Sequence, residues 1–375
     1  MATTIWYSNP SSGNAMDFTD SNQWNTATDG SGVAGNPDSI DDKAVIQNGD
    51  TVTLDDNVTV GQVSIESGGT LTGNTSFSLT LAGSDQDNNY NNSGSVTNLN
   101  LIMTGIRASG DRTFVDVGSG LRDLTLNDAT NSGNNVHIFG NNLAISGNLT
   151  ITAGTLDTVN VVGGYYNLDV AGDILIQNGG TLTANTSLVE ARSLTVDSGG
   201  TYNATSAVTK IQGSRAADAY GLDLKDGTVN HNAGTFRYEG SGGTALNFAD
   251  THIYNLELNV TGSSGSAITL HGDASNSVTI NNDFTMENAS GQGMLVPLGA
   301  DGYAFNVGGN MYMKYLDRST SENLQFGYNQ TASGTWTIEG TLAILNANEH
   351  VRIRATSGTF NLGGLINDGG RIDSQ

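Results

Sequence analysis

The sequence predicts an all-β protein, a right-handed parallel β-solenoid (β-helix), from its composition and from an imperfect internal repeat. The 375 residues include 50 glycines but only 3 prolines, and only 36% of them are apolar. This apolar share is low for a globular chain, so a thin core that repeats along an axis fits better than one large core. Short β-branched runs recur along the whole chain, which argues against a disordered polymer.

The repeat consists of a short alternating strand, a small polar turn, and then Gly-Thr followed by another apolar residue. Clear and looser copies span Val63–Leu71, Leu149–Leu156, Leu175–Leu182, Leu194–Tyr202, Val229–Phe236 and Ile353–Phe360. Alternation at a period of two places one row of side chains inward and the next row outward. Glycine supplies the positive φ that the turn needs, and Asn and Thr side chains can hydrogen-bond along a stack of strands.

An antiparallel β-sandwich is the alternative architecture, but the repeats lack the regular hairpin pairs of that fold. No stretch has the sustained apolar spacing of an amphipathic helix. The nearest candidate, Ser214–Tyr220, has room for one or two turns at most.

The first 44 residues differ from the rest and are predicted to form an N-terminal cap, with the solenoid occupying residues 45–375. They hold two of the three tryptophans and two of the three prolines. A cap covers strand edges that would otherwise promote aggregation. Large aromatic side chains are also the usual anchors of protein interfaces. We therefore expect Trp6, Tyr7, Phe18 and Trp24 to fill the first turn of the solenoid, to dock it onto a larger particle, or both.

The net charge of −23, from 37 acids and 14 bases, argues against a nucleic-acid partner, which would require clustered Lys and Arg. It also disfavours anionic lipid, and no run approaches the ~20 apolar residues of a membrane span, so we expect no membrane insertion. Without cysteine, no disulfide or thiolate metal site is possible. The N-terminus lacks the pattern of a secretion signal, so we expect folding in the cytoplasm or export by another route.

No motif predicts a cofactor or a catalytic centre. Gly30–Gly35 fits the dinucleotide fingerprint, but no strand precedes it and Asn36-Pro37 follows where a helix should begin. Asp85, Asp87 and Asn89 resemble the opening of a calcium loop without the later EF-hand ligands, so metal binding stays open. The histidines are scattered, which disfavours a zinc site. They are His137, His231, His252, His271 and His350.

A polysaccharide-degrading β-helix enzyme is the main catalytic alternative. Its site would need two or three carboxylates, or a carboxylate with Arg or Lys, on one face of successive coils. Widely spaced acids could assemble such a face, although the short motifs of pectin-degrading hydrolases do not occur together in this chain.

An aromatic-rich stretch lies late in the chain. Exposed aromatic rings would stack on sugars and form a receptor-binding face, whereas rings turned inward would fill wider coils. Inward stacking is the preferred interpretation. The residues concerned are Tyr303, Phe305, Tyr312, Tyr315, Phe326, Tyr328 and Trp336.

Residues 40–72 carry the clearest likeness to known proteins. There Asp-Asp-Lys-Ala-Val-Ile-Gln-Asn-Gly-Asp-Thr-Val-Thr-Leu is followed by a Gly-Gly-Thr-Leu coil, after an opening rich in Trp and Asn. The chain resembles β-helical virion structural proteins of tailed bacteriophages and, more loosely, haemagglutinin-like β-helical adhesins. Adhesins normally carry a secretion signal, so its absence favours the phage resemblance.

The phage resemblance implies a non-enzymatic fibre, spike or decoration protein, assembled in the host cytoplasm and exposed on the virion surface. Its partners would be other virion proteins of the capsid or tail. A host surface glycan and further copies of the chain are additional candidate partners. A bacterial surface adhesin and a polysaccharide-degrading enzyme remain the alternative functions.

Overall fold

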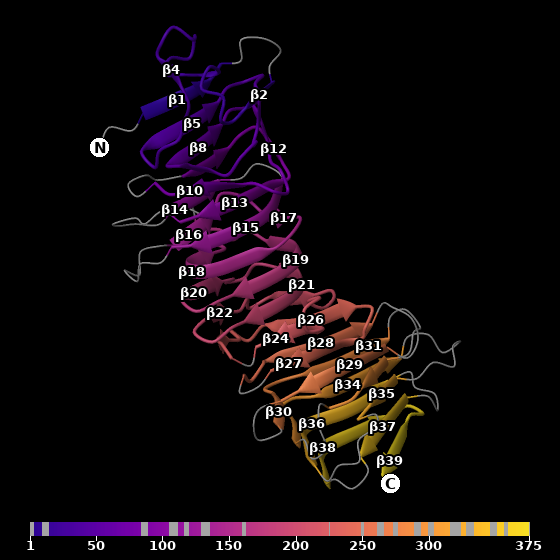
Figure 1. Cartoon of the computed structure of the whole chain (residues 1–375). Coiled ribbons are helices and arrows are strands. Elements are labelled where there is room, and N and C mark those ends of the chain that lie inside the picture. The colour runs from indigo at the N-terminus through magenta and orange to yellow at the C-terminus, as the bar shows by residue number, and fades with distance from the viewer. Residues whose placement is uncertain are drawn as a thin grey trace. The chain divides into compact units, whose positions relative to one another are not determined.

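The computed structural model describes most of the chain, in segments separated by short gaps. These segments are residues 4–9, 15–83, 89–104, 112–115, 120–128, 136–159, 163–224, 226–248, 251–260, 266–272, 277–288, 294–298, 304–315, 324–327, 334–345, 351–355 and 359–374. Within them all regular elements are β-strands, and none of these residues forms a helix (Figure 1). The prediction of an all-β protein is therefore confirmed.

The segment Ser214–Tyr220 forms a single turn, which the N–H of Ala219 closes by donating to the carbonyl of Arg215 at 2.9 Å. The described segments contain no helix long and apolar enough to cross a membrane.

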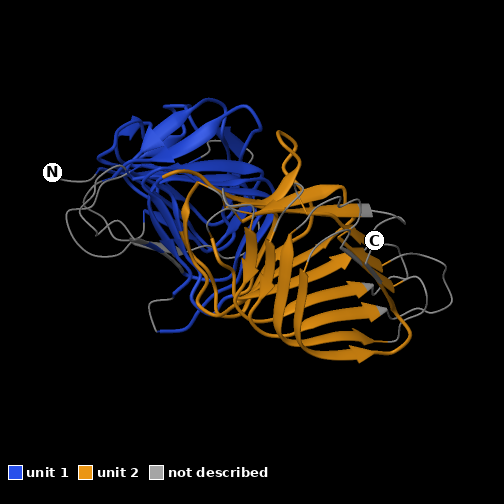
Figure 2. Ribbon diagram, turned by 90° about the horizontal axis from the view of Figure 1, so that it is seen from below, with its two compact units in different colours: residues 1–187, 199–201 blue, residues 188–198, 202–375 orange. Residues whose placement is uncertain are grey.

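The chain divides into two compact units (Figure 2). The first comprises residues 1–187 and 199–201, and the second comprises residues 188–198 and 202–375. Residues 1–44 thus belong to the first unit together with the strands that follow them. The boundary between the units falls within the region predicted to be one solenoid.

The strands of the first unit form three parallel ladders. The first ladder contains β1 (Thr4–Ser8), β5 (Asp42–Ile46), β8 (Gln62–Ile65), β11 (Tyr90–Asn92), β14 (Arg112–Val115), β16 (Val136–Phe139), the end of β18 (Leu149–Asp157) and β20 (Gly180–Thr183). The second contains β7 (Val58–Val60), β10 (Ser78–Leu81), β13 (Leu99–Met103), β15 (Leu121–Asn127), β17 (Leu143–Ile145), the start of β18 and β19 (Leu168–Ile176). The third contains β2 (Ala15–Asp17), β6 (Thr51–Thr53), β9 (Thr70–Thr72) and β12 (Ser95–Thr97).

The strands of the second unit also pair in parallel. One ladder contains the start of β21 (Val189–Val196), β23 (Val208–Ile211), β26 (Thr235–Gly240), β28 (Asn255–Val260), β31 (Phe284–Asn288), β34 (Met311–Tyr315), β36 (Thr335–Leu345) and β38 (Thr359–Asn367). Another contains the end of β21, β24 (Tyr220–Asp223), β27 (Thr244–Asn247), β29 (Ser266–His271), β32 (Met294–Val296), β35 (Leu324–Phe326), β37 (Val351–Ala355) and β39 (Arg371–Ser374).

A shorter ladder of the second unit joins β30 (Ser277–Ile280) and β33 (Ala304–Val307) to the first halves of β36 and β38. Two further short strands are β22 (Thr201–Asn203) and β25 (Thr228–Asn230). The side chains of Asn203 and Asn230 hydrogen-bond to each other at 2.7 Å.

Antiparallel pairing is rare in the described segments. It joins β1 to β3 (Trp24–Asn25), β3 to β4 (Ala34–Gly35), and Val159 to Tyr165 in an isolated bridge. The expected parallel pairing is thus confirmed over the alternative of hairpin pairs. Parallel pairing also begins before Val45, because β1 pairs with β5 and β2 pairs with β6. Residues 1–44 therefore supply ladder strands as well as the antiparallel pair, and their role as a cap stays a prediction.

Like residues stack above like residues along each ladder, as the alternating pattern predicts. In the third ladder Met16, Val52, Leu71 and Val96 lie in register, and each is at most 4% exposed. The residues on either side of them in each strand are mostly threonines that point outward. A thin apolar column with polar flanks is what a period-two sequence produces when its strands pair in register.

The two glycines of the Gly-Gly-Thr turn serve different purposes. Gly179 has a φ of +88°, a conformation that L side chains rarely adopt, and Gly68 has the same φ in the earlier copy of the repeat. Gly180 instead lies against the preceding layer, where an added Cβ would lie 2.3 Å from the carbonyl oxygen of Ile151. The first glycine permits the bend and the second permits close stacking.

Asn and Asp side chains form hydrogen-bonded chains from layer to layer at the corners of both units. In the second unit the side-chain oxygen of Asn255 accepts from the N–H of Asp283 at 3.2 Å, and Asp283 accepts from the N–H of Asn310 at 2.7 Å. Asn310 in turn accepts from the N–H of Thr341 at 2.9 Å. In the first unit the side-chain oxygen of Asp123 accepts from the N–H of Asn148, and the side-chain oxygen of Asn148 accepts from the N–H of Asp173. These bonds satisfy backbone donors where the strands end.

Replacing Asp283 with alanine is expected to lower the free energy of unfolding by about 1–3 kcal/mol, because the N–H of Asn310 loses its acceptor. The matched control is Asp283→Asn, which keeps a side-chain oxygen in place as Asn255 and Asn310 do. Urea unfolding followed by circular dichroism measures the difference. Equal losses in both variants would show that the acceptor oxygen is not what stabilises this corner.

Candidate functional site

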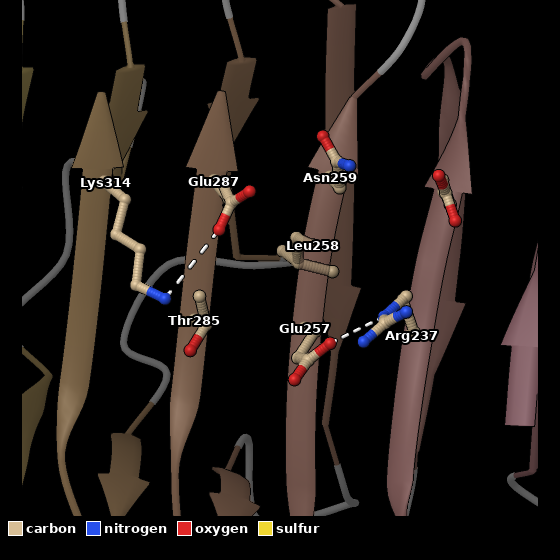
Figure 3. A pocket seen from close by; sticks show the side chains of 8 residues that line it. Arg237, Glu257, Leu258, Asn259, Thr285, Glu287 and Lys314 are labelled. Atoms are coloured by element: carbon tan, nitrogen blue, oxygen red, sulfur yellow. Dashed lines mark hydrogen bonds and ion pairs between the residues drawn. The ribbon is translucent and has the colours of Figure 1, made fainter. Parts of the chain in front are cut away.

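A shallow polar groove lies on the outward face of four neighbouring strands of the second unit, β26, β28, β31 and β34 (Figure 3). Its volume is about 350 Å³. Strand alternation creates this face, since Phe236 and Tyr238 on β26 point into the core while Arg237 and Glu239 point outward. The groove crosses the strands, and each strand contributes polar side chains to it.

The charged side chains of the groove pair across strands. The Nε of Arg237 donates to Glu257 at 2.6 Å, and the Nζ of Lys314 lies 3.7 Å from a carboxylate oxygen of Glu287 (Figure 3). Each pair joins residues that face each other in the register of adjacent strands. Opposite charges at such directly paired positions stabilise a sheet by a few tenths of a kcal/mol to about 1 kcal/mol. Thr285, which lies beside Glu257 in the register, separates the two ion pairs.

The row of charges continues onto β23 and β21. The Nζ of Lys210 lies 3.2 Å from a carboxylate oxygen of Glu190 and 3.2 Å from one of Glu239. Burial on its own lowers the pKa of Lys210, but its hydrogen bonds to Glu239 and Glu190 raise the pKa overall. The lysine is thus held in its charged form between two strands. Four glutamates and three bases make this face almost neutral in a chain whose net charge is −23.

An aromatic ring lies at the same face. Tyr312 is half-buried on β34, beside Thr285 in the register, and the Nζ of Lys314 lies 5.7 Å from the centre of its ring. The groove therefore combines carboxylates, a guanidinium, an ammonium and a hydroxyl, and Tyr312 lies beside it on the same face. Such a set suits a polyhydroxylated ligand, whose hydroxyls both donate and accept and whose ring faces stack on aromatics.

None of the groove's charged residues was identified from the sequence. The polysaccharide-degrading alternative requires carboxylates with Arg or Lys on one face of successive coils, but the sequence does not show which residues would form that face. To predict that Arg237 faces Glu257, and Glu287 faces Lys314, the pairing register of the strands must be known. The spacing between paired strands varies along the chain, so the sequence does not reveal it.

The four N-terminal aromatics predicted to plug the first turn or dock the protein divide into two pairs. Phe18 and Trp24 are fully buried, with ring centroids 5.2 Å apart, and the indole N–H of Trp24 donates to the carbonyl of Phe18 at 2.9 Å. Trp6 and Tyr7 on β1 are half-buried. Only these two therefore present part of their surface for docking, which stays a prediction.

The late aromatic stretch mostly points inward. Phe305, Phe326 and Trp336 are buried, and Phe326 lies 4.6 Å and 5.0 Å from the other two rings, centroid to centroid. Phe284 and Phe360 extend this cluster. The preferred interpretation of inward stacking holds for these residues, whereas Tyr312 points outward. Tyr303, Tyr328 and the side chain of Tyr315 lie outside the described part of the chain.

The motifs considered for cofactors and metals do not form a site in the described segments. Gly30–Gly35 forms a turn that leads into β4, and no helix follows it. Asp85 and Asp87 lie outside the described residues, so the calcium question stays open. A search of the described segments finds no group of three or more His, Asp or Glu side chains that could hold a metal ion.

Among the histidines, His271 is half-buried on β29, and burial lowers its pKa more than the nearby carboxylate of Asp223 raises it. His231 stacks on Tyr254 with ring centroids 5.5 Å apart. His252 is exposed, and His350 lies outside the described residues.

A buried histidine–carboxylate pair lies inside the first unit. The Nε2 of His137 on β16 and the Oδ2 of Asp128 are 2.5 Å apart, and the residues are 0% and 2% exposed. Such a pair has the chemistry of a general acid or base, but both side chains are buried. We interpret it as a structural hydrogen bond that pairs the Nε2 of His137 with one carboxylate oxygen of Asp128 in the core.

No protein-family profile, curated protein or solved structure matches this chain. The resemblance of residues 40–72 to phage virion proteins therefore stays a prediction.

Replacing Asp128 with alanine is expected to lower the free energy of unfolding by about 1–3 kcal/mol, because the buried imidazole of His137 loses its partner. The double variant Asp128→Leu/His137→Leu is the matched control. It removes both polar groups, so its stability should lie closer to that of the unchanged protein. Thermal and urea unfolding measure both. A double variant less stable than Asp128→Ala would contradict a purely structural role.

Proposed function

We propose that the chain is a right-handed parallel β-solenoid that acts as a non-enzymatic structural protein on the surface of a bacteriophage particle. In this role it is a fibre, spike or decoration component, assembled in the host cytoplasm with capsid or tail proteins as partners. The observation that carries the proposal is the parallel, in-register pairing within each unit, from β1 to β20 and from β21 to β39. Such pairing builds an extended surface that repeats its side chains at regular intervals.

Three further features support a scaffold over a catalyst. The corner bonds of Asn and Asp stabilise successive layers rather than one site. Glu239, Glu257 and Glu287 of the groove each lie against a base, as expected for a cross-strand network of charges. The strongly acidic composition favours a soluble, solvent-facing surface. A bacterial surface adhesin is the alternative with the same architecture.

Glycan binding at the groove is a second candidate function, favoured by the outward position of Tyr312 beside the row of charges. The groove crosses the strands, so successive sugar residues of a linear glycan would meet successive strands spaced about 4.8 Å apart. Carboxylates and Arg237 would then bind hydroxyls while the ring of Tyr312 stacks on a sugar face. Cleavage of such a glycan is the enzymatic alternative.

The structural role is tested by mass spectrometry of particles purified from cells that express this gene in its natural context. Peptides of the chain should occur in the particles at a constant ratio to the major capsid protein, as expected for an assembled component. An antibody against the chain should label the intact particle from outside in electron micrographs. Particles that are complete yet lack the chain would overturn the proposal.

The glycan candidate is tested with an array of bacterial surface polysaccharides. We expect Tyr312→Ala to weaken binding about 2- to 12-fold, equivalent to about 0.5–1.5 kcal/mol of lost stacking. Tyr165→Ala, at an exposed tyrosine of the first unit, is the matched control and should bind normally. Reducing ends are assayed on every glycan that binds. Turnover that Glu257→Gln abolishes would show an enzyme, and absence of binding to any glycan would exclude this candidate.

A further inference from the structure

Six of the seven large hydrophobic side chains that are exposed in the described segments lie within residues 5–40 or on β38 and β39. They are Ile5 (38% exposed), Val33 (69%), Ile40 (54%), Leu365 (52%), Ile366 (55%) and Ile372 (40%), and Tyr165 (47%) is the remaining one in the described segments. Most other apolar side chains of the ladders are buried. These residues therefore form two groups of exposed apolar side chains, which mark candidate contact sites.

At the C-terminal end, β38 and β39 are edge strands. Among the described strands β38 pairs only with β36, and β39 pairs only with β37. Met311, Leu342 and Leu365 form one in-register column, but the first two are at most 1% exposed whereas Leu365 is 52% exposed. Leu365 thus continues a core column without a following layer. The edge also presents backbone N–H and C=O groups on its open side, which makes a β-strand the fitting occupant.

At the N-terminal end, β1 is open along its first half. Its inner side pairs with β5 from Thr4 to Tyr7, whereas β3 covers the outer side only at Tyr7 and Ser8. Ile5 lies in the uncovered half, and exposed Val33 and Ile40 belong to the same first 44 residues. This end therefore offers a second open strand edge, on which Ile5 is exposed.

The two ends carry opposite charge. Residues 1–44 contain six aspartates and one lysine, a net charge of −5, whereas residues 351–375 contain three arginines and two aspartates, a net charge of +1. The C-terminal end is thus a basic segment in a chain of net charge −23. Copies repel one another at long range, but at physiological ionic strength this repulsion is screened beyond about 8 Å. The opposite net charges of the two ends favour contact between them at short range.

We propose that the C-terminal edge of one copy of this chain docks on the N-terminal edge of a second copy. The strands on both edges belong to parallel ladders, so end-to-end contact continues the pairing, buries the exposed apolar residues and joins opposite charges. Such a contact joins two different surfaces, so it generates a chain of copies or a closed ring. The proposal does not depend on the phage role. If that role also holds, only the first copy leaves its N-terminal end free for the particle.

Two variants, each with one end blocked, test this contact. Ile5→Lys places a base on the acidic end, and Ile366→Asp places an acid on the basic end. Sedimentation velocity over a concentration series at about 0.15 M salt should show growing assemblies for the unchanged protein and monomers for each variant. An equimolar mixture of the two variants should form dimers that grow no further, because one copy keeps an intact C-terminal edge and the other an intact N-terminal edge.

Tyr165→Asp, at an exposed side chain away from both ends, is the matched control and should assemble like the unchanged protein. Circular dichroism melting verifies folding, and Val33→Lys with Leu365→Asp provides a second pair if either first variant is unfolded. A monomeric unchanged protein at all concentrations would overturn the proposal and point to another chain as the occupant. Dimers of Ile5→Lys alone would indicate tail-to-tail contact, and a mixture that stays monomeric would exclude end-to-end docking.

Discussion

In-register parallel pairing between strands of successive layers is the constraint on which the rest of this structure depends. It places equivalent positions directly above one another, so a single choice of residue type is repeated as a column. Apolar columns such as Met16, Val52, Leu71 and Val96 supply the core with few side chains per layer. This explains how a chain with only 36% apolar residues folds.

The same constraint carries a cost that the chain must offset. Stacking identical charges one strand apart would be repulsive, since strands lie only about 4.8 Å apart. In the second unit Lys210 and Arg237 do face each other in the register, and carboxylates lie against both of them: Lys210 contacts Glu190 and Glu239, and Arg237 contacts Glu257. At corners, where strands end and backbone N–H groups would lack partners, the side-chain oxygens of Asn and Asp accept their hydrogen bonds. The frequency of Gly, Asn and Thr is thus a consequence of layer geometry.

The sequence predicts those parts of the fold that local spacing determines. The repeat Val63–Leu71 forms β8, a turn and β9, with the positive φ at Gly68 that the turn chemistry requires. It does not predict which strands pair, because the chain length between paired strands varies. For that reason the sequence does not reveal that β1 and β2, within the predicted cap, also pair with ladder strands.

The site shows the same division between local and long-range information. The sequence does not show whether an aromatic side chain points into the core or outward. Phe18 and Trp24 are buried whereas Trp6 is half-buried, and Phe305 is buried whereas Tyr312 points outward. These differences follow from how the strands pair. The charged residues that line the groove cannot be identified from the sequence. Arg237 and Glu257 become partners through pairing that no local pattern encodes.

The corner bonds also show how much length variation the architecture tolerates. Successive bonds in the first unit join residues 25 positions apart, whereas those of the second unit span 28, 27 and 31 positions. The bonds are equivalent although the intervening segments differ by up to six residues. Extra residues between two corners therefore need not disturb the ladders on either side. Foreign peptides grafted between β34 and β35, which lie between the corners at Asn310 and Thr341, should leave both neighbouring layers paired, which makes the chain a scaffold for displaying epitopes.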